Sequence, residues 1–168
     1  MTRRARATRP VMPAGYGVPE TDEGLLGWSW AVARLESALN YWFATTRPDG
    51  RPHAMPAWGV WLDGALYFEG SPATRRARNL AAKPAVSVHL ESGDEVVIVE
   101  GRAHDAADPE RALAERLASA FGAKYGETRW EYRPTPDQWN HGGLWRLEPD
   151  VAFGWTEFPR DVTRWLFD

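Results

Sequence analysis

Three arginines at the start of one short predicted helix are the side chains in this sequence best suited to chemistry. They are Arg75, Arg76 and Arg78, and no acidic residue lies between Gly70 and Lys83 to neutralise them. The N-terminus of a helix carries a partial positive charge, which attracts anions and repels cations. Positive side chains at this end therefore indicate either a bound anion or carboxylates supplied by other parts of the fold.

The residues before these arginines predict how the helix begins. Ser71 is a favoured capping residue, and Pro72 suits the first helical position. Free backbone N–H groups at such a start, the hydroxyls of Ser71 and Thr74, and guanidinium groups together make a phosphate site. Successive helical side chains point about 100° apart, so we expect some arginines to meet the anion and others to serve packing or a partner subunit. The alternative is that all three pair with acids elsewhere in the fold or are solvated.

The elements that must position the arginine-bearing helix are mostly strands. The sequence predicts strands over residues 41–46, 52–62, 65–69, 86–90, 95–103, 144–147, 151–156 and 163–167. Helices are predicted over residues 23–39, within 70–82 and over 108–121. Pro56 and Gly59 are expected to bend the second strand. Short turns between consecutive strands favour a mainly β fold, an antiparallel split barrel with appended helices, over a parallel doubly wound sheet.

Length and composition exclude several classes of protein. The 168 residues suit one domain, which we assign to residues 21–168, and the Arg-, Pro- and Gly-rich residues 1–20 are expected to form a flexible arm. The absence of cysteine excludes disulfides and cysteine nucleophiles and fits a cytoplasmic protein. No apolar run approaches the roughly 20 residues that span a bilayer, so we expect no membrane partner. The net charge of −3 argues neither for nor against nucleic acid, and we expect no nucleic-acid partner.

Five segments in a fixed order resemble the pyridoxamine 5′-phosphate oxidase-like split-barrel proteins. The resemblance is closest to the branch that uses a flavin or the deazaflavin coenzyme F420. It is clear over residues 42–103 and weaker over residues 144–155. The segments that carry it are Trp42–Thr46, Asp49–His53, Pro56–Trp61, Leu66–Phe68 and Arg78–Val88.

The resemblance implies a homodimer of split barrels, with FMN or F420 bound noncovalently through its phosphate between the subunits. By position, the residues on the phosphate side would be Ser71, Thr74, Arg76, Arg78 and Asn79. The strand beside the tricyclic ring would present His53, Met55, Pro56, Ala57 and Trp58. F420 is favoured over FMN because several cations can accompany its acidic tail as well as its phosphate. Ten tryptophans fit such a protein, since large flat side chains suit interfaces and ring-shaped ligands.

Other motifs are absent. The Arg-Leu-His-Asp-like C-terminal signature of the true pyridoxamine phosphate oxidases is missing, so we do not expect oxidation of vitamin B6. No serine lies in a nucleophile elbow, which argues against hydrolysis. The four histidines are not spaced as metal ligands, so we expect no metal, and His141 is the one candidate for an axial heme ligand. No residue is singled out as a catalytic acid or base.

Two functions remain open at this point. The first is an oxidoreductase that uses F420, or alternatively FMN, to transfer hydride to or from a small organic substrate. The second is a non-enzymatic flavin, deazaflavin or heme carrier or sensor on the same fold. Nucleic-acid binding through the basic arm is a weaker hypothesis, which would require an affinity that falls steeply with salt. We expect that replacing Arg76 and Arg78 together by Ala abolishes cofactor binding and leaves the fold intact.

Overall fold

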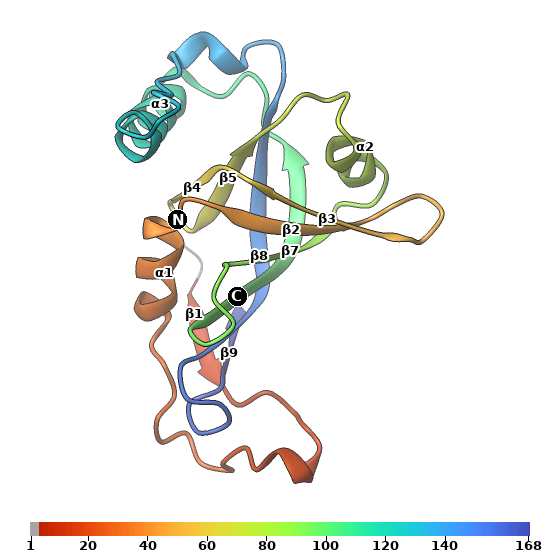
Figure 1. The fold of residues 1–168 in the computed structure, drawn as a ribbon, viewed down its shortest axis with the longest axis vertical. Coiled ribbons are helices and arrows are strands. Elements are labelled where there is room, and N and C mark those ends of the chain that lie inside the picture. Colours follow the sequence, from red (N-terminus) through yellow and green to blue (C-terminus); the bar gives the residue numbers. More distant parts are fainter. Residues whose placement is uncertain (1–3) are drawn as a thin grey trace.

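The structure, a computed structural model, describes residues 4–168 (Figure 1). Its helices are α1 (Trp28–Ser37), α2 (Arg75–Ala82) and α3 (Arg111–Tyr125), with short 3₁₀ turns η1 (Ala14–Tyr16) and η2 (Pro136–Trp139). Its strands are β1 (Ala5–Thr8), β2 (Tyr41–Thr46), β3 (Pro52–Ala57), β4 (Gly59–Leu62), β5 (Ala65–Glu69), β6 (Ala85–His89), β7 (Val96–Asp105), β8 (Leu144–Trp155) and β9 (Thr163–Phe167). Among the described residues, no helix has the length and apolar character required to cross a membrane.

Strand β8 divides the sheet. Every strand pair is antiparallel, and the main path runs β1-β9-β8-β7-β6-β2-β3. One edge of β8 pairs with β7, whereas the other edge pairs first with β5 over residues 144–147 and then with β9 over residues 151–154. Among the described strands the sheet is not closed, because β1 and β3 end its main path and β4, which pairs only with β5, ends the branch. The mainly antiparallel split barrel predicted from the sequence is therefore confirmed.

Two apolar cores meet at the β4–β5 hairpin. Trp61 and Phe68 face the main core, which α1, α2 and the large sheet complete. The alternate residues Val60 and Tyr67 face a second core under α3 and η2. Figure 1 shows α1 and α3 toward one side of the strands and α2 toward the other. The end of β5, at Glu69, consequently lies where the two cores and the start of α2 come together.

The structure divides one predicted strand into two and joins two other predicted strands into one. Residues 52–62 are not one bent strand, because β3 pairs with β2 while β4 pairs with β5, and the break falls at Trp58. Residues 144–155 form one strand rather than two. The register shifts between Glu100, which faces Val151, and Gly101, which faces Pro149. This bulge lets a strand continue through a proline.

The N-terminal segment differs from the flexible arm predicted for residues 1–20. Strand β1 pairs with β9, with Ala5 opposite Phe167. The Arg9 guanidinium donates hydrogen bonds to the carbonyl oxygens of Thr21 and Val162, each at 3.0 Å. An edge strand of four residues is too short to show a period in the sequence. Residues 1–3 of the predicted arm lie outside the described residues.

The outer helices differ from prediction at their ends. Helix α1 begins at Trp28, with Gly27 at its cap, rather than after Asp22. The preceding residues are held against β9 instead, where the Leu26 N–H donates to Thr163 Oγ1 at 2.9 Å. Helix α3 ends at residue 125 rather than at residue 121. Neither change moves the segment that carries the arginines.

The bulge between β7 and β8 makes a stability test possible. A Cβ atom on Gly101 would lie 2.0 Å from the Glu148 carbonyl oxygen. We expect Gly101→Ala to lower the free energy of unfolding by about 2 kcal/mol or more, because the contact is with backbone. Gly93→Ala is the matched control, since an added Cβ there meets nothing within 4 Å. Equal urea midpoints for the two variants would contradict the bulge.

Candidate functional site

Helix α2 begins at Arg75, with Thr74 rather than Ser71 as its cap. Thr74 Oγ1 accepts a hydrogen bond from the Ala77 backbone N–H at 3.2 Å. Ser71 Oγ instead accepts one from the Ala73 N–H at 3.2 Å, within the turn before the helix. The cap predicted from the sequence, Ser71, is therefore wrong, and the hydroxyl residue three positions later caps the helix. Both hydroxyls nevertheless lie at the start of the helix.

The three arginines of α2 divide into an exposed pair and a buried one. Arg75 and Arg78 are exposed, whereas Arg76 is only 3% exposed. None of the three forms an ion pair with a carboxylate within residues 4–168. The helix also carries no acidic residue in its first turn. Its arginines therefore have no carboxylate ion-pair partner in the described part of the chain. The nearby Asp49 is bound to Arg51, and its pKa is lowered by those hydrogen bonds and also by the charges of Arg47 and Arg75.

Arg76 is held inside the main core. The carbon of its guanidinium lies 4.9 Å from the ring centroids of both Phe43 and Phe68, and Nη2 donates to the backbone carbonyl of Glu69. Burial lowers the pKa of Arg76 to about 10. Because this side chain ties α2 to the end of β5, its removal would cost stability. The structure thus corrects the expectation that Arg76 can be replaced with the fold intact.

Asn79 connects α2 to the β2–β3 hairpin from within the protein. Its Nδ2 donates to Thr45 Oγ1 at 3.0 Å, and it has no exposed surface. The Thr45 hydroxyl in turn lies 3.3 Å from the carbonyl oxygen of His53 and 3.4 Å from its Nδ1. Thr45 was not predicted as part of the site. The alternating pattern of residues 41–46 does, however, place Thr45 on the buried face of that strand. Asn79 and Thr45 therefore position β3 relative to α2.

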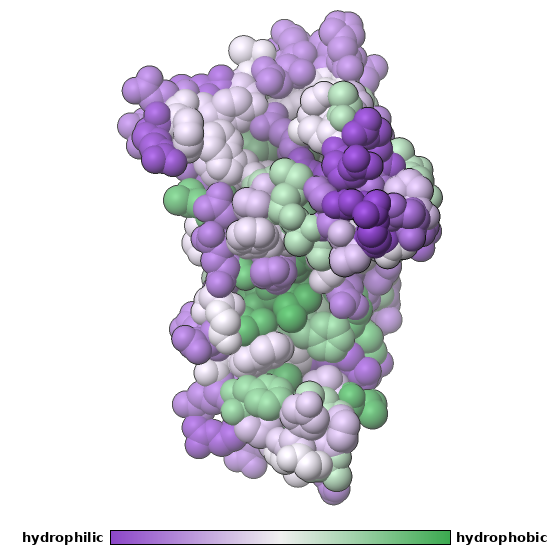
Figure 2. All heavy atoms as spheres, turned by 45° about the vertical axis from the view of Figure 1, so that its right-hand side comes forward, coloured by the Kyte–Doolittle hydropathy of each residue, from purple (hydrophilic) through white to green (hydrophobic). Residues whose placement is uncertain are grey.

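Positive charge surrounds His53. The pKa of its imidazole is lowered, first by burial and then by the charges of Arg47, Arg75 and Arg76. His53 is consequently neutral at neutral pH. Figure 2 shows strongly hydrophilic surface over the β2–β3 turn and α2, beside apolar surface over the sheet. The two segments together carry more positive than negative charge, although Asp49 on the turn pairs with Arg51 at 2.8 Å. The sequence indicated such a surface only for α2.

Three buried polar atoms in this region find no hydrogen-bond partner among residues 4–168. They are Arg47 Nε, Arg76 Nη1 and Asn79 Oδ1. More than about nine in ten buried polar groups in folded proteins find a partner, so three such atoms in one region indicate a missing partner. Two of them belong to guanidinium groups, whose natural partners are phosphate or carboxylate oxygens. The two guanidinium nitrogens are donors and suit an anion, whereas Asn79 Oδ1 is an acceptor that a phosphate cannot satisfy. Since all three atoms are buried, the fit to a phosphate-bearing group depends on the exposed Arg75 and Arg78 beside them.

The predicted ring-side residues follow β3 on alternating faces. His53, Met55 and Ala57 lie on the same face as the buried residues of β2 and are half-buried. Pro56 is exposed on the opposite face, across from Trp42. Since successive residues of a strand point to opposite sides, these four cannot all face one ring. The structure brings His53 close to α2 and places Pro56 away from it.

Trp58 and Ser71 meet in a cleft of about 230 Å³. The cleft also contains Glu69 and two aromatic residues, Tyr132 and Trp139, that the sequence had assigned only to a loop. The Gly70 N–H donates to the Gly143 carbonyl at 2.9 Å, which closes one side. The only signal for Glu69 was a carboxylate at the end of an otherwise buried strand. His141, the candidate heme ligand, is exposed on the loop between η2 and β8.

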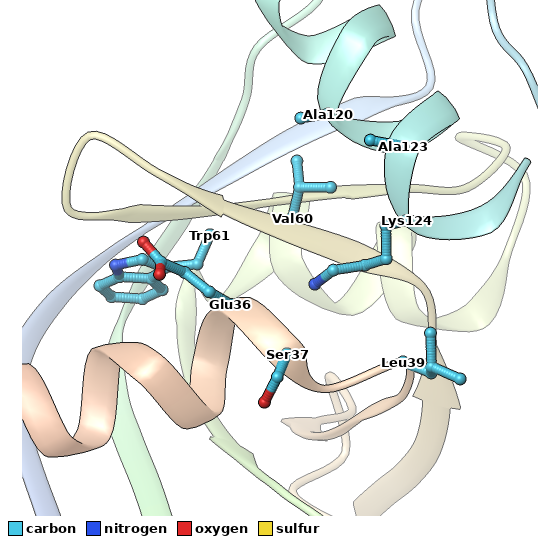
Figure 3. Close-up of a pocket in the computed structure, with 8 residues that line it drawn as sticks. All are labelled: Glu36, Ser37, Leu39, Val60, Trp61, Ala120, Ala123 and Lys124. Atoms are coloured by element: carbon cyan, nitrogen blue, oxygen red, sulfur yellow. The ribbon is translucent and has the colours of Figure 1, made fainter.

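A larger hollow lies between α1 and α3 and contains none of the predicted site residues (Figure 3). Lys124 extends into it from α3, and its Nζ donates to Tyr41 Oη at 2.9 Å and to the Ala38 carbonyl at 3.0 Å. Burial lowers the pKa of Lys124 to about 8. These bonds attach α3 to the link between α1 and β2. We therefore assign Lys124 a structural role.

Residues 31–155 match the sequence model of the pyridoxamine 5′-phosphate oxidase family. The chain belongs to this family. The matched region runs from α1 to the end of β8, so it includes β3, α2 and the cleft at Trp58. No curated protein matches the chain in sequence.

Solved structures share the family's split barrel. A conserved hypothetical protein from Mycobacterium tuberculosis is 26% identical, with a TM-score of 0.65 over 82% of this chain and 89% of that chain. An F420 reductase is 23% identical, with a TM-score of 0.53 over 71% and 93%. A FAD-binding protein from Mesorhizobium loti is 18% identical, with a TM-score of 0.59 over 97% of both chains. Heme-binding proteins have the fold as well. These likenesses establish the fold, and proteins that share it bind flavin-type cofactors or heme.

Proposed function

We propose that the protein is an oxidoreductase that binds F420, or alternatively FMN, noncovalently and transfers hydride to or from a small organic molecule. The observation that carries this proposal is the positive charge of α2, whose arginines form no ion pair with any described carboxylate. A cofactor phosphate would supply the missing partner. The similarity in fold to an F420 reductase and a FAD-binding protein supports a ring-bearing cofactor.

The phosphate side of the proposed site has an exposed layer and a buried layer. Arg76 and Asn79, which the sequence placed against the phosphate, belong to the buried layer. They position the exposed residues, Arg76 through the Glu69 carbonyl and Asn79 through Thr45. The residues that would contact the phosphate are Ser71, Thr74, Arg75 and Arg78.

The ring side of the proposed site is the edge of β3. β3 ends the main path of the sheet, with β2 as its neighbour, so it presents backbone N–H and C=O groups along its other edge. Such groups suit the pyrimidine edge of a flavin or deazaflavin, and Trp58 supplies an aromatic surface where the strand ends. When bound, the cofactor supplies the hydride chemistry, while these residues bind and orient it.

The spread of charge favours F420 over FMN. Arg47, on the β2–β3 turn, and Arg75, on α2, both act on His53, so the positive charge extends from the helix to the hairpin. Lys83 lies at the same turn, where its Nζ is 3.4 Å from the Arg47 carbonyl oxygen. An acidic tail in addition to a phosphate would be accommodated by this surface.

We further propose that two copies associate through the outer face of the sheet. Trp42, His89, Ile98 and Phe153 are successive neighbours across β2, β6, β7 and β8. Trp42, Ile98 and Phe153 are half-buried and belong to neither apolar core. An apolar sheet face of this kind is typical of an interface. Sedimentation equilibrium should give the mass of a dimer, and the mass of a single chain would contradict this proposal.

Cofactor binding is tested by fluorescence titration of the purified protein with F420 and FMN side by side. We expect the double variant Arg75→Gln/Arg78→Gln to bind at least about tenfold more weakly, since two charge-assisted hydrogen bonds to phosphate are lost. Its melting temperature should not change, because both side chains are exposed. Arg116→Gln, on the exposed face of α3, is the matched control.

Four results would count against the proposal. Unchanged affinity in the double variant would reject the phosphate site, and no binding of either cofactor would reject the class of ligand. Binding of a cofactor with no hydride transfer to any electron acceptor would indicate a carrier or sensor instead. An absorption band characteristic of bound heme after addition of hemin, with no flavin or deazaflavin binding, would favour the heme-binding alternative.

A further inference from the structure

Glu69 is a carboxylate held firmly in the cleft beside Trp58. Its Oε1 accepts hydrogen bonds from Tyr132 Oη at 2.8 Å and from Trp139 Nε1 at 2.6 Å. Trp139 is 1% exposed, so one of the two donors is fixed in the second core. Both donors reach the same oxygen. The other carboxylate oxygen, Oε2, receives no hydrogen bond from the residues that the structure describes.

No positive side chain neutralises this carboxylate. Glu69 forms no ion pair within residues 4–168, and the adjacent Arg76 donates to its backbone carbonyl rather than to its side chain. Burial raises the pKa of Glu69, while the hydrogen bonds from Tyr132 and Trp139 oppose that rise. A partly buried carboxylate without a cation is costly, and the two hydrogen bonds offset only part of this cost. The cleft therefore holds a carboxylate that has no cationic partner among the described residues.

The walls of the cleft are aromatic. Trp58 stacks on Tyr125, with ring centroids 4.8 Å apart, and its centroid lies 5.7 Å from that of Tyr132. Trp58, Tyr132 and Trp139 all line the cleft with Glu69. Faces of Trp and Tyr attract cations, and this attraction strengthens where water is excluded. A carboxylate and aromatic faces in one cleft favour the same kind of ligand, a positively charged organic group.

We propose that this cleft binds the cationic amine group of an organic molecule, with Glu69 as its counter-ion and Trp58 and Tyr132 as its aromatic walls. Trp58 and Ser71 belong both to this cleft and to the proposed cofactor site. The amine-bearing molecule would thus lie beside the cofactor. Its assignment as the substrate rests on the proposed oxidoreductase function, whereas binding of the cation to the cleft does not require a cofactor.

The test compares a cation with a neutral molecule of the same shape. Benzylamine and benzyl alcohol are titrated into the cofactor-free protein, with tryptophan fluorescence and calorimetry as readouts. We expect benzylamine to bind about tenfold or more tightly than benzyl alcohol, because only the amine forms a charge-assisted hydrogen bond with Glu69. Equal affinity for the two molecules in the unaltered protein would overturn the proposal without any variant.

Glu69→Gln removes the charge and keeps the shape. We expect this variant to lose the preference for benzylamine. Glu36→Gln is the matched control, since Glu36 is an exposed carboxylate in the separate hollow between α1 and α3. A preference for benzylamine that survives Glu69→Gln, or that disappears in Glu36→Gln, would overturn the assignment.

The same samples separate this proposal from the oxidoreductase function. Selective benzylamine binding in a protein that binds neither F420 nor FMN would support the cation site and reject its role as a substrate site. Cofactor binding without any preference for benzylamine over benzyl alcohol would overturn the cation site and leave the oxidoreductase proposal unaffected.

Discussion

The positive charge of α2, whose arginines form no ion pair with a carboxylate within residues 4–168, is the constraint on which this part of the structure depends. A buried guanidinium is costly unless hydrogen bonds and opposite charge compensate it. Arg76 has one carbonyl partner and two aromatic faces, and one of its nitrogens has no partner. Arg75 and Arg78 add further charge on the exposed side of the same helix, whose N-terminus is itself positive. An anion bound at Arg75 and Arg78 would offset this positive charge, including that of the buried Arg76 beside them, which it would not contact.

The divided sheet places this charge beside a cleft. The break at Trp58 sends β3 to the end of the sheet and β4 to the hairpin that carries Glu69. The chain then passes from Ser71, in the cleft, through α2 to Lys83 at the β2–β3 turn, where the Lys83 Nζ lies 3.4 Å from the Arg47 carbonyl oxygen. The bond from Asn79 to Thr45 fixes α2 alongside the hairpin. Strand β3 therefore has arginines around His53, near its start, and the acidic, aromatic cleft beside Trp58, where it ends.

The sequence predicted the features that depend on local patterns and missed those that depend on distant partners. Alternating strands, tight turns and a helix with three arginines were all predicted, and the family resemblance was correct. Helical spacing could not show that Arg76 faces inward, because Ala77 and Leu80 are the only apolar side chains that mark that face. The contacts of Glu69 could not be predicted from the sequence, since Tyr132 and Trp139 lie 63 and 70 residues away along the chain. Only the packing of α3 and η2 against β5 brings them together.

The most direct test of the central claim is the pKa of His53, followed by NMR of the histidine side chains with and without inorganic phosphate. Burial and the charges of Arg47, Arg75 and Arg76 hold this pKa below its usual value. An anion bound among these guanidinium groups offsets their charge, so phosphate should raise the pKa of His53. The signals of the other three histidines provide internal references. A His53 titration that is the same with and without saturating phosphate would contradict an anion site at α2.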